Sequence, residues 1–371
     1  QWGALRKDQI NGLTSSQVYA IETGDLAKLS TTQIAAFKTN IRGFNTDQIV
    51  ALTTTQVSGL DSSQIQALTS TQLPAMETAD LIKLNSAQFN ALTTRQIQAL
   101  STLQLANLST DQLANMTTDS VQALTTAQIS SLAAANINKL STATLSAIET
   151  ADFASMSSAQ IFALDTAHIV AMTTAQLRGL DSADFAAINT ADIAALTSDQ
   201  FNALTTVQVI GITTAQLVAL TTDQAGLLTS AQVAALTGAQ VAAFATDDFV
   251  KLTTTVISKL TTAQVAALAT SQVNNMTTDQ LVSLTTASVA KLTTDQVVAL
   301  TTAQMPNLTS AQVGALSSSQ IRAMQTVDFA QISTTAISSI TTAALSGLTT
   351  AQVVALTTDQ AAVISPTQVP A

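Results

Sequence analysis

The sequence predicts an all-α fold, a solenoid of very short capped helices with one helix in every eight residues. The first observation is a repeat with the pattern Leu-Thr-Thr-x-Gln-Val-x-Ala, whose large apolar first residue recurs from Phe44 to Ile364 without a slip. The second is a helix-start signal inside each repeat. The third is the spacing of the apolar residues. Such a repeat is typical of an array in which each unit contacts only its neighbours.

The repeat divides the chain into three stretches, and we number each repeat from its apolar first residue, the anchor, as positions 1 to 8. Residues 1–43 carry divergent repeats; one residue is missing between the anchors Phe37 and Phe44, and Trp2 and Tyr19 are the only residues of their kinds. Residues 44–364 form the continuous octapeptide array. Residues 365–371 are the end of the array.

Each repeat contains the residues that start a helix. Position 2 is mostly Thr, Ser, Asp or Asn, whose side-chain oxygen caps a helix N-terminus. Gln at position 5 completes a Ser/Thr-x-x-Gln capping box, and the aliphatic residues at positions 1 and 6 form a hydrophobic staple. Pro366 follows Ser365 at the first helical position, where proline is favoured. Pro74, Pro306 and Pro370 lie at position 7, where a regular helix loses a hydrogen bond, so we expect looser single turns there.

A β-solenoid with eight-residue sides is the alternative, because Thr and Val favour strands. The apolar positions 1 and 6 are separated alternately by five and three residues. Odd separations fall on opposite faces of a strand, whereas residues three apart share a helix face. One octapeptide cannot fold alone, since fixing eight backbone residues costs roughly 8–16 kcal/mol and its two aliphatic side chains contribute roughly 3–6 kcal/mol. The helices must therefore share their buried faces.

The placement of phenylalanine predicts a structural unit of sixteen residues. Phe at position 6 occurs at separations that are all multiples of 16: Phe89, Phe153, Phe185, Phe201, Phe249 and Phe329. This pattern indicates that alternate helices occupy distinct environments, as in stacked antiparallel pairs.

Composition limits the function classes. A formal charge of −10 with only 13 Lys and Arg argues against a nucleic-acid partner. The absence of cysteine rules out disulfides and thiolate metal sites. No apolar run of about 18 residues is present, so we predict no transmembrane segment.

We predict no catalytic, cofactor-binding or metal-binding residue. His168, the only histidine, stands at position 5, and we interpret it as a polar substitution at a helix start. Acidic pairs at positions 2 and 5 are interpreted as caps that complement the helix dipole. These pairs are Glu22 and Asp25, Glu77 and Asp80, Glu149 and Asp152, and Asp181 and Asp184. Asp247 and Asp248 form the densest acidic spot but no metal loop.

The run Leu-Thr-Thr-Ala-Gln-Val-x-Ala-Leu at 260–268 and 348–356 resembles repeat tracts of very large proteobacterial surface and secreted proteins, described as adhesin-like or haemagglutinin-like. The resemblance implies an extracellular or cell-surface location and carries no catalytic residues. Because the chain begins at Gln1 without an initiator Met or a signal peptide, we expect it to be part of something longer.

We therefore expect a structural, non-enzymatic protein, an elongated stalk, spacer or scaffold. One alternative is a self-assembling filament or sheet, in which the partner is another copy of the chain. A second is an adhesive module that binds a glycan or a protein of a host or cell surface. A third, ice binding, rests on the regular threonines alone.

Overall fold

The structure is a computed structural model that describes residues 2–368, and every regular element in that range is a helix. No strand is present among these residues, so the all-α prediction is confirmed and the β-solenoid alternative is wrong. The chain forms two compact units, residues 1–188 and residues 189–371. The repeat gave no indication of this division, and the predicted boundaries near residues 43 and 364 stay a prediction.

The α-helices are four to six residues long. The first unit contains η1 (Trp2–Ala4), α1 (Lys7–Asn11), α2 (Ser15–Tyr19), α3 (Thr23–Leu26), α4 (Thr31–Ala36), η2 (Lys38–Gly43), α5 (Thr46–Val50), α6 (Thr54–Ser58), α7 (Ser62–Ala67), α8 (Gln72–Ala75), α9 (Thr78–Leu81), α10 (Ser86–Phe89), α11 (Thr94–Ala99), α12 (Thr102–Ala106), α13 (Thr110–Ala114), α14 (Thr118–Gln122), α15 (Thr126–Ser131), α16 (Ala134–Ile137), α17 (Thr142–Ala147), α18 (Thr150–Phe153), α19 (Ser158–Phe162), α20 (Thr166–Ala171), α21 (Thr174–Gly179) and α22 (Ser182–Ala187). The second unit contains α23 (Thr190–Ala195), α24 (Ser198–Asn202), α25 (Thr206–Gly211), α26 (Thr214–Val218), α27 (Thr222–Leu227), α28 (Ser230–Ala235), α29 (Gly238–Ala242), α30 (Thr246–Phe249), α31 (Thr254–Ile257), α32 (Thr262–Ala267), α33 (Thr270–Asn275), α34 (Thr278–Ser283), α35 (Thr286–Val289), α36 (Thr294–Val298), η3 (Met305–Asn307), α37 (Ser310–Gly314), α38 (Ser318–Ala323), α39 (Thr326–Phe329), α40 (Thr334–Ile337), α41 (Thr342–Leu345), α42 (Thr350–Ala355) and α43 (Thr358–Val363).

The start and the end of each helix follow from the repeat, as α32 illustrates. Thr261 has an extended backbone and its Oγ1 accepts the backbone N–H of Gln264 at 3.2 Å. The Oε1 of Gln264 in turn accepts the N–H of Thr261 at 2.8 Å. The predicted capping box is therefore present. The helix ends because Leu268, the next anchor, returns to φ −55° and ψ 140°. With Ala269, also extended, it forms a corner of two residues between helices.

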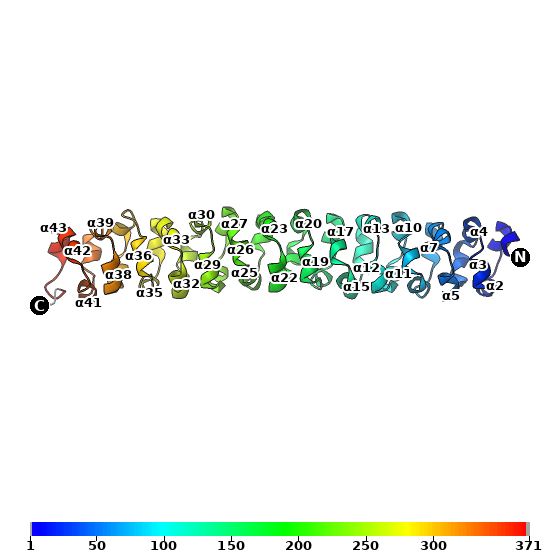
Figure 1. Cartoon of the computed structure of the whole chain (residues 1–371), viewed down its shortest axis with the longest axis horizontal. Coiled ribbons are helices and arrows are strands. Elements are labelled where there is room, and N and C mark those ends of the chain that lie inside the picture. Colours follow the sequence, from blue (N-terminus) through cyan, green and yellow to red (C-terminus); the bar gives the residue numbers. More distant parts are fainter. Residues whose placement is uncertain (1, 369–371) are drawn as a thin grey trace. The chain divides into compact units, whose positions relative to one another are not determined.

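Three helices make one turn of the solenoid. Each helix packs against the helix 24 residues further along: α26 against α29, α29 against α32, and α32 against α35. In Figure 1 the helices of each unit follow one another as stacked turns. The predicted sixteen-residue unit of antiparallel pairs is wrong. A corner of two extended residues turns the chain without reversing it, so three helices are needed before the chain returns to the same side.

The core lies inside the turns and consists of positions 1 and 6. Val265 and Val273, at position 6, are 0% exposed, and the anchors Leu268 and Met276 are 4% exposed. The six phenylalanines at position 6 are buried in the same way as valine and leucine at other repeats, so their separations do not report the stacking period. Each unit of nearly 190 residues contains about eight 24-residue turns. At roughly 8–10 Å between packed helices, a unit is on the order of 60–80 Å long.

Irregular repeats are accommodated by 3₁₀ helices. The residue missing between Phe37 and Phe44 is absorbed by η2, where Lys38 has a positive φ of 46°. The two phenylalanine rings then meet edge to face at 5.1 Å. The looser turns predicted at position-7 prolines are found at Pro306, which lies in η3, and at Pro74, which lies in the four-residue α8. Pro370 lies outside the described residues. None of the described helices has the length and apolar character to cross a bilayer.

Candidate functional site: the glutamine ladder

The most unusual feature of the interior is a buried glutamine at position 5 of most repeats. Gln64 is 0% exposed and Gln264 is 1% exposed. A carboxamide carries two N–H donors and an acceptor oxygen, and burying it is unfavourable unless these groups are hydrogen-bonded. The site therefore has to be understood through the partners of this one side chain.

Each end of the Gln264 carboxamide serves a different helix. Its Oε1 completes the capping box at the start of α32, as described above. Its Nε2 donates to the carbonyl oxygens of Val233 at 2.8 Å and Leu236 at 2.7 Å. These carbonyls lie at the end of α28, where the last carbonyls of a helix lack partners within that helix. One side chain thus caps the N-terminus of its own helix and the C-terminus of a helix in the preceding turn.

The same connection recurs along both units, and we call these residues the glutamine ladder. The acceptor is usually the anchor carbonyl 28 residues earlier, joined in many repeats by a carbonyl 30 or 31 residues earlier. The members include Gln33, Gln48, Gln56, Gln64, Gln72, Gln88, Gln96, Gln104, Gln112, Gln128, Gln160 and Gln176 in the first unit, and Gln224, Gln232, Gln240, Gln264, Gln272, Gln280, Gln296, Gln304, Gln312, Gln320, Gln352, Gln360 and Gln368 in the second.

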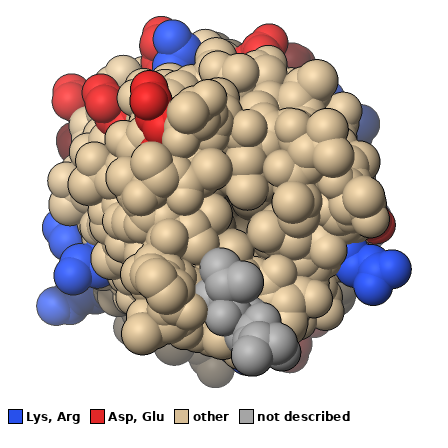
Figure 2. All heavy atoms as spheres, turned by 90° about the vertical axis from the view of Figure 1, so that its left-hand side faces the viewer, with Lys and Arg blue, Asp and Glu red and all other residues tan. Residues whose placement is uncertain are grey.

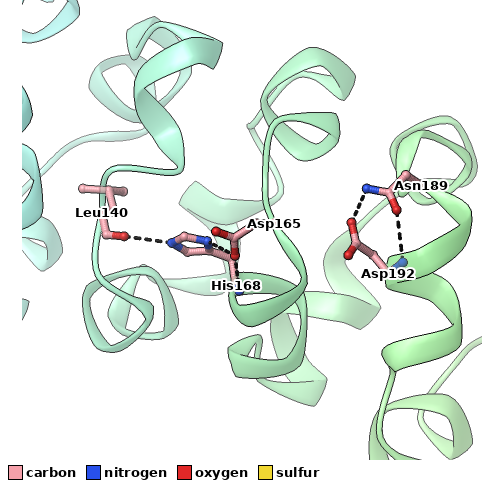
Figure 3. Close-up of polar contacts among 5 residues, drawn as sticks. All are labelled: Leu140, Asp165, His168, Asn189 and Asp192. Atoms are coloured by element: carbon pink, nitrogen blue, oxygen red, sulfur yellow. Dashed lines mark hydrogen bonds and ion pairs between the residues drawn. The ribbon is translucent and has the colours of Figure 1, made fainter.

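His168 takes the place of a ladder glutamine in the first unit. It is 5% exposed, and its Nδ1 lies 2.7 Å from Oδ1 of Asp165, the N-cap of α20. Its Nε2 lies 2.8 Å from the carbonyl oxygen of Leu140, the anchor 28 residues earlier (Figure 3). The backbone N–H of His168, followed by its side chain and charge, lowers the pKa of Asp165. The interpretation of His168 as a substitution at a helix start is consistent with this geometry, which also gives it a connection to the preceding turn.

The acidic pairs divide into two kinds. Asp181 caps α22, accepting the N–H groups of Ala183 at 2.9 Å and Asp184 at 2.8 Å. The glutamates Glu22, Glu77 and Glu149 stand at the N-cap, and the aspartate of each pair lies in the first turn, as the dipole interpretation predicts. These glutamates accept no cap hydrogen bond, so the expectation of a hydrogen-bonded cap is wrong for them. Glutamate is one methylene longer than the aspartate that caps well, and it is not among the preferred N-cap residues.

In several repeats, aspartate takes the place of the position-5 glutamine. We call the contact between a position-5 side chain and the preceding turn a joint, and at these joints the N–H donor of the glutamine amide is missing. In the second unit, burial raises the pKa of Asp248 and, in the same way, that of Asp328. Asp192 makes a hydrogen bond with Asn189, the N-cap of its own helix α23 (Figure 3). An ionised carboxylate can only accept hydrogen bonds, so these joints differ in kind from the glutamine joints.

Ser120 interrupts the ladder in the first unit and leaves a pocket. Its hydroxyl accepts a hydrogen bond from Thr117 within the same repeat, at 2.8 Å. The pocket beside it is lined by Asn90 and by Leu92, the anchor 28 residues earlier. The Oδ1 of Asn90 is buried there without a hydrogen-bond partner. The shorter side chain bonds within its own repeat, and one acceptor of the preceding turn, Oδ1 of Asn90, stays unpaired.

Apart from the buried aspartates at position 5, which are Asp80, Asp184, Asp192, Asp248 and Asp328, the charged side chains lie outside this interior. Figure 2, which faces the end at the C-terminal turn, shows Lys, Arg, Asp and Glu around the rim and uncharged residues across the middle of that face. Within residues 2–368, no three His, Asp or Glu side chains are grouped so that they could hold a metal ion. What the arrangement does is structural: it hydrogen-bonds each turn to the turn before it.

The sequence predicted the partner of the glutamine oxygen but not the partner of its nitrogen. The capping box predicts the role of the glutamine oxygen, but no reasoning on a single repeat predicts where its nitrogen binds. One signal was available. Glutamate serves a capping box as well as glutamine does, yet the three glutamates of the chain, Glu22, Glu77 and Glu149, all stand at position 2 and none at position 5. The use of glutamine and never glutamate at position 5 indicates that the amide donor has a role.

Comparison with known families agrees with the repeat. The family described as the ALTTAQ repeat matches residues 18–60, 41–77, 73–110, 145–182, 177–214, 241–278, 275–310 and 321–358, which together cover more than half of the chain. No match is found among curated proteins.

Proposed function

The chain belongs to the ALTTAQ repeat family, and we propose that it is a structural, non-enzymatic protein that serves as a stalk, spacer or scaffold at a bacterial cell surface or in an extracellular matrix. The observation that carries the proposal is the glutamine ladder. It uses polar side chains, most of them buried, to join turns, and the amide groups of these side chains are occupied by hydrogen bonds.

A ladder of this kind suits a spacer because the glutamine joints are nearly the same along the array. Gln96 and Gln296, in different units, reach carbonyls 31, 30 and 28 residues earlier, with distances of 2.7–3.3 Å. The stability of such an array is a sum over repeats and nearest-neighbour interfaces. Length can then change by one 24-residue turn without any change to the core, which is what a spacer requires.

The surface location is proposed from composition and from the sequence resemblance. The chain has no cysteine and a formal charge of −10, both compatible with an exported bacterial protein. The Leu-Thr-Thr-Ala-Gln-Val runs resemble tracts of large surface and secreted proteins. Detection of the chain at the surface of intact cells by antibody labelling supports this location, and its recovery only from the cytoplasm contradicts it.

Small-angle scattering of the purified chain tests the spacer role. A compact protein of 371 residues has a radius of gyration of about 21 Å, and we expect a clearly larger value that does not change with concentration. A value at or below 21 Å contradicts the proposal. A scattering mass that grows with concentration favours the self-assembling filament instead, because identical joints can continue between copies.

A further inference from the structure

One turn of the second unit lacks the glutamine ladder completely. The turn of residues 324–347 has Asp328, Ala336 and Ala344 at its three position-5 sites, with exposures of 4%, 1% and 1%. Alanine has no hydrogen-bonding side chain, and an ionised aspartate has no donor. No buried amide therefore reaches from this turn to the turn before it.

The carbonyl oxygens that glutamines at these sites would bind lie in the preceding turn. By the 28-residue spacing, three glutamines at these sites would bind the anchor carbonyls of Leu300, Leu308 and Leu316. These three carbonyls receive no side-chain hydrogen bond in the structure, although their anchors are each 3% exposed. Each missing glutamine also removes the acceptor for an N-cap N–H, as at Ser333 and Thr341, which keep only the hydroxyl half of the cap.

We call the boundary between the turn of residues 300–323 and the turn of residues 324–347 the plane. The turns on both sides of this plane are fully hydrogen-bonded to their other neighbours. Below it, the turn of residues 300–323 is bonded to the turn before it through Gln304, Gln312 and Gln320, at 2.9, 2.9 and 2.8 Å from the anchor carbonyls. Above it, Gln352, Gln360 and Gln368 bind the anchor carbonyls of the 324–347 turn at 3.0, 2.7 and 2.7 Å. The interruption is therefore a single plane between two fully bonded stacks.

Packing and two exposed hydrogen bonds hold this plane together. Ser310 donates to the carbonyl of Thr335 at 3.2 Å, and Gln325 donates to the carbonyl of Val298 at 3.2 Å, both in exposed positions. The helices approach closely at Gly347, which faces Ser318 across the plane. Exposed hydrogen bonds compete with water and contribute less to stability than buried ones.

In the first unit, a turn that also lacks glutamine is hydrogen-bonded to the turn before it by other position-5 side chains. The turn of residues 132–155 also lacks glutamine, with Asn136, Thr144 and Asp152 at position 5. There Thr144 donates to the carbonyl of Met116 at 2.9 Å, and Asp152 accepts from the hydroxyl of Thr126 at 2.5 Å. Position-5 side chains thus still bridge two of those three corners, whereas none bridges the plane before residue 324.

We propose that the second unit opens preferentially along this plane, and that residues 324–368 separate from residues 300–323 as one body. The two turns of this block are joined by Gln352, Gln360 and Gln368, so once detached from the turn that covered their apolar face they unfold together and their helical N–H groups exchange with water. The opening plane follows from the hydrogen-bond pattern alone. Its use as a release point under load rests on the proposed structural function.

Hydrogen exchange of the full chain, read by mass spectrometry at peptide resolution, tests the plane. In the natural sequence we expect amides of residues 324–363 to exchange together, about tenfold or more faster than those of residues 300–316, with a step between the two. The variant D328Q/A336Q/A344Q restores three ladder residues and should slow exchange of the block to that of its neighbours.

A matched variant moves the interruption. Q304A/Q312A/Q320A removes the ladder from the joint below, so the step in exchange should move one turn earlier, to residues near 300. A smooth rise in exchange toward residue 368 without a step overturns the proposal, because it indicates fraying from the end of the chain. A step that stays in place in Q304A/Q312A/Q320A overturns it as well.

The two variants keep the test decisive. If the repaired variant fails to fold, as judged by its helical circular dichroism, the position of the step in Q304A/Q312A/Q320A decides alone. A compact radius of gyration would contradict the spacer function and leave the exchange pattern unaffected, so the two proposals fail in different experiments.

Discussion

Replacing Gln264 by glutamate separates the two roles of the ladder side chain. Glutamate keeps the oxygen that accepts the N–H of Thr261, and it has the same length as glutamine. It loses the Nε2 donors, which lie 2.8 Å from the carbonyl oxygen of Val233 and 2.7 Å from that of Leu236. The carboxylate would be directed at two carbonyl oxygens in a site where the natural side chain is 1% exposed.

The expected loss can be worked from these contacts. Burial and the facing carbonyls should raise the pKa of the introduced glutamate, so the folded state binds a proton. Taking up that proton at pH 7 from a group with a usual pKa of about 4.3 costs about 3.7 kcal/mol. One of the two amide hydrogen bonds is also lost, at roughly 1 kcal/mol. We therefore expect Q264E to lose roughly 4–5 kcal/mol of local opening free energy at pH 7.

The sign of the pH dependence makes the prediction specific. A group whose pKa is raised on folding destabilises at neutral pH, and this cost disappears as the pH falls through the folded pKa. The deficit of Q264E should shrink to roughly 1–2 kcal/mol at pH 4. The control Q264M has a similar length and no charge. It loses the hydrogen bonds of the amide, roughly 2–4 kcal/mol, equally at both pH values.

Hydrogen exchange of the amides in α28 and α32 at pH 7 and pH 4 measures these differences. Local exchange is preferred to a melting temperature because repeat arrays do not unfold in one step. Protection of Q264E equal to that of the natural protein at pH 7 would refute the reasoning, since it would show that the amide nitrogen does not stabilise the joint. A pH-independent deficit would show that the introduced carboxyl is not buried.

Three further changes test other parts of the structure. A Cβ added at Gly347 would lie 2.5 Å from the carbonyl oxygen of Ser318, so G347A should destabilise the contact by roughly 1–3 kcal/mol and speed amide exchange in α38 and α41. At Gly24 the added Cβ meets nothing within 4 Å, so G24A should not speed exchange in α3. S120Q should extend the ladder, fill the pocket and slow amide exchange in α10 and α14; unchanged or faster exchange contradicts the ladder geometry there. Burial raises the pKa of Asp248 above its ordinary 3.8, so the folded state holds the proton more tightly and this group's contribution to stability increases as the pH falls toward 3.8. D248N should therefore be more stable than the natural protein at pH 7 and lose that advantage in acid, and an advantage that is the same at pH 7 and pH 3 would contradict the role of the carboxyl charge.

The sequence predicted the local structure well because its signals act within one repeat. The capping box and the staple both join residues at most five apart, as in Leu260, Thr261, Gln264 and Val265, and the structure contains them where the pattern placed them. The failures are of two kinds. Glutamate was assigned a capping role that its longer side chain does not perform at Glu77. The stacking period was inferred from phenylalanine, which is buried at position 6 in the same way as the valine and leucine of other repeats.

The sequence by itself determined that this chain is an array of short capped helices with an apolar stripe at positions 1 and 6, because capping and helical periodicity are interactions between near neighbours. Only the tertiary structure decided that three helices complete a turn and that the nitrogen of the position-5 glutamine binds the turn before. Both depend on the direction that two extended corner residues give to the chain, summed over three corners. The partners that result, such as Gln264 and Leu236, are 28 residues apart, and a backbone carbonyl has no sequence signature by which that contact could be recognised.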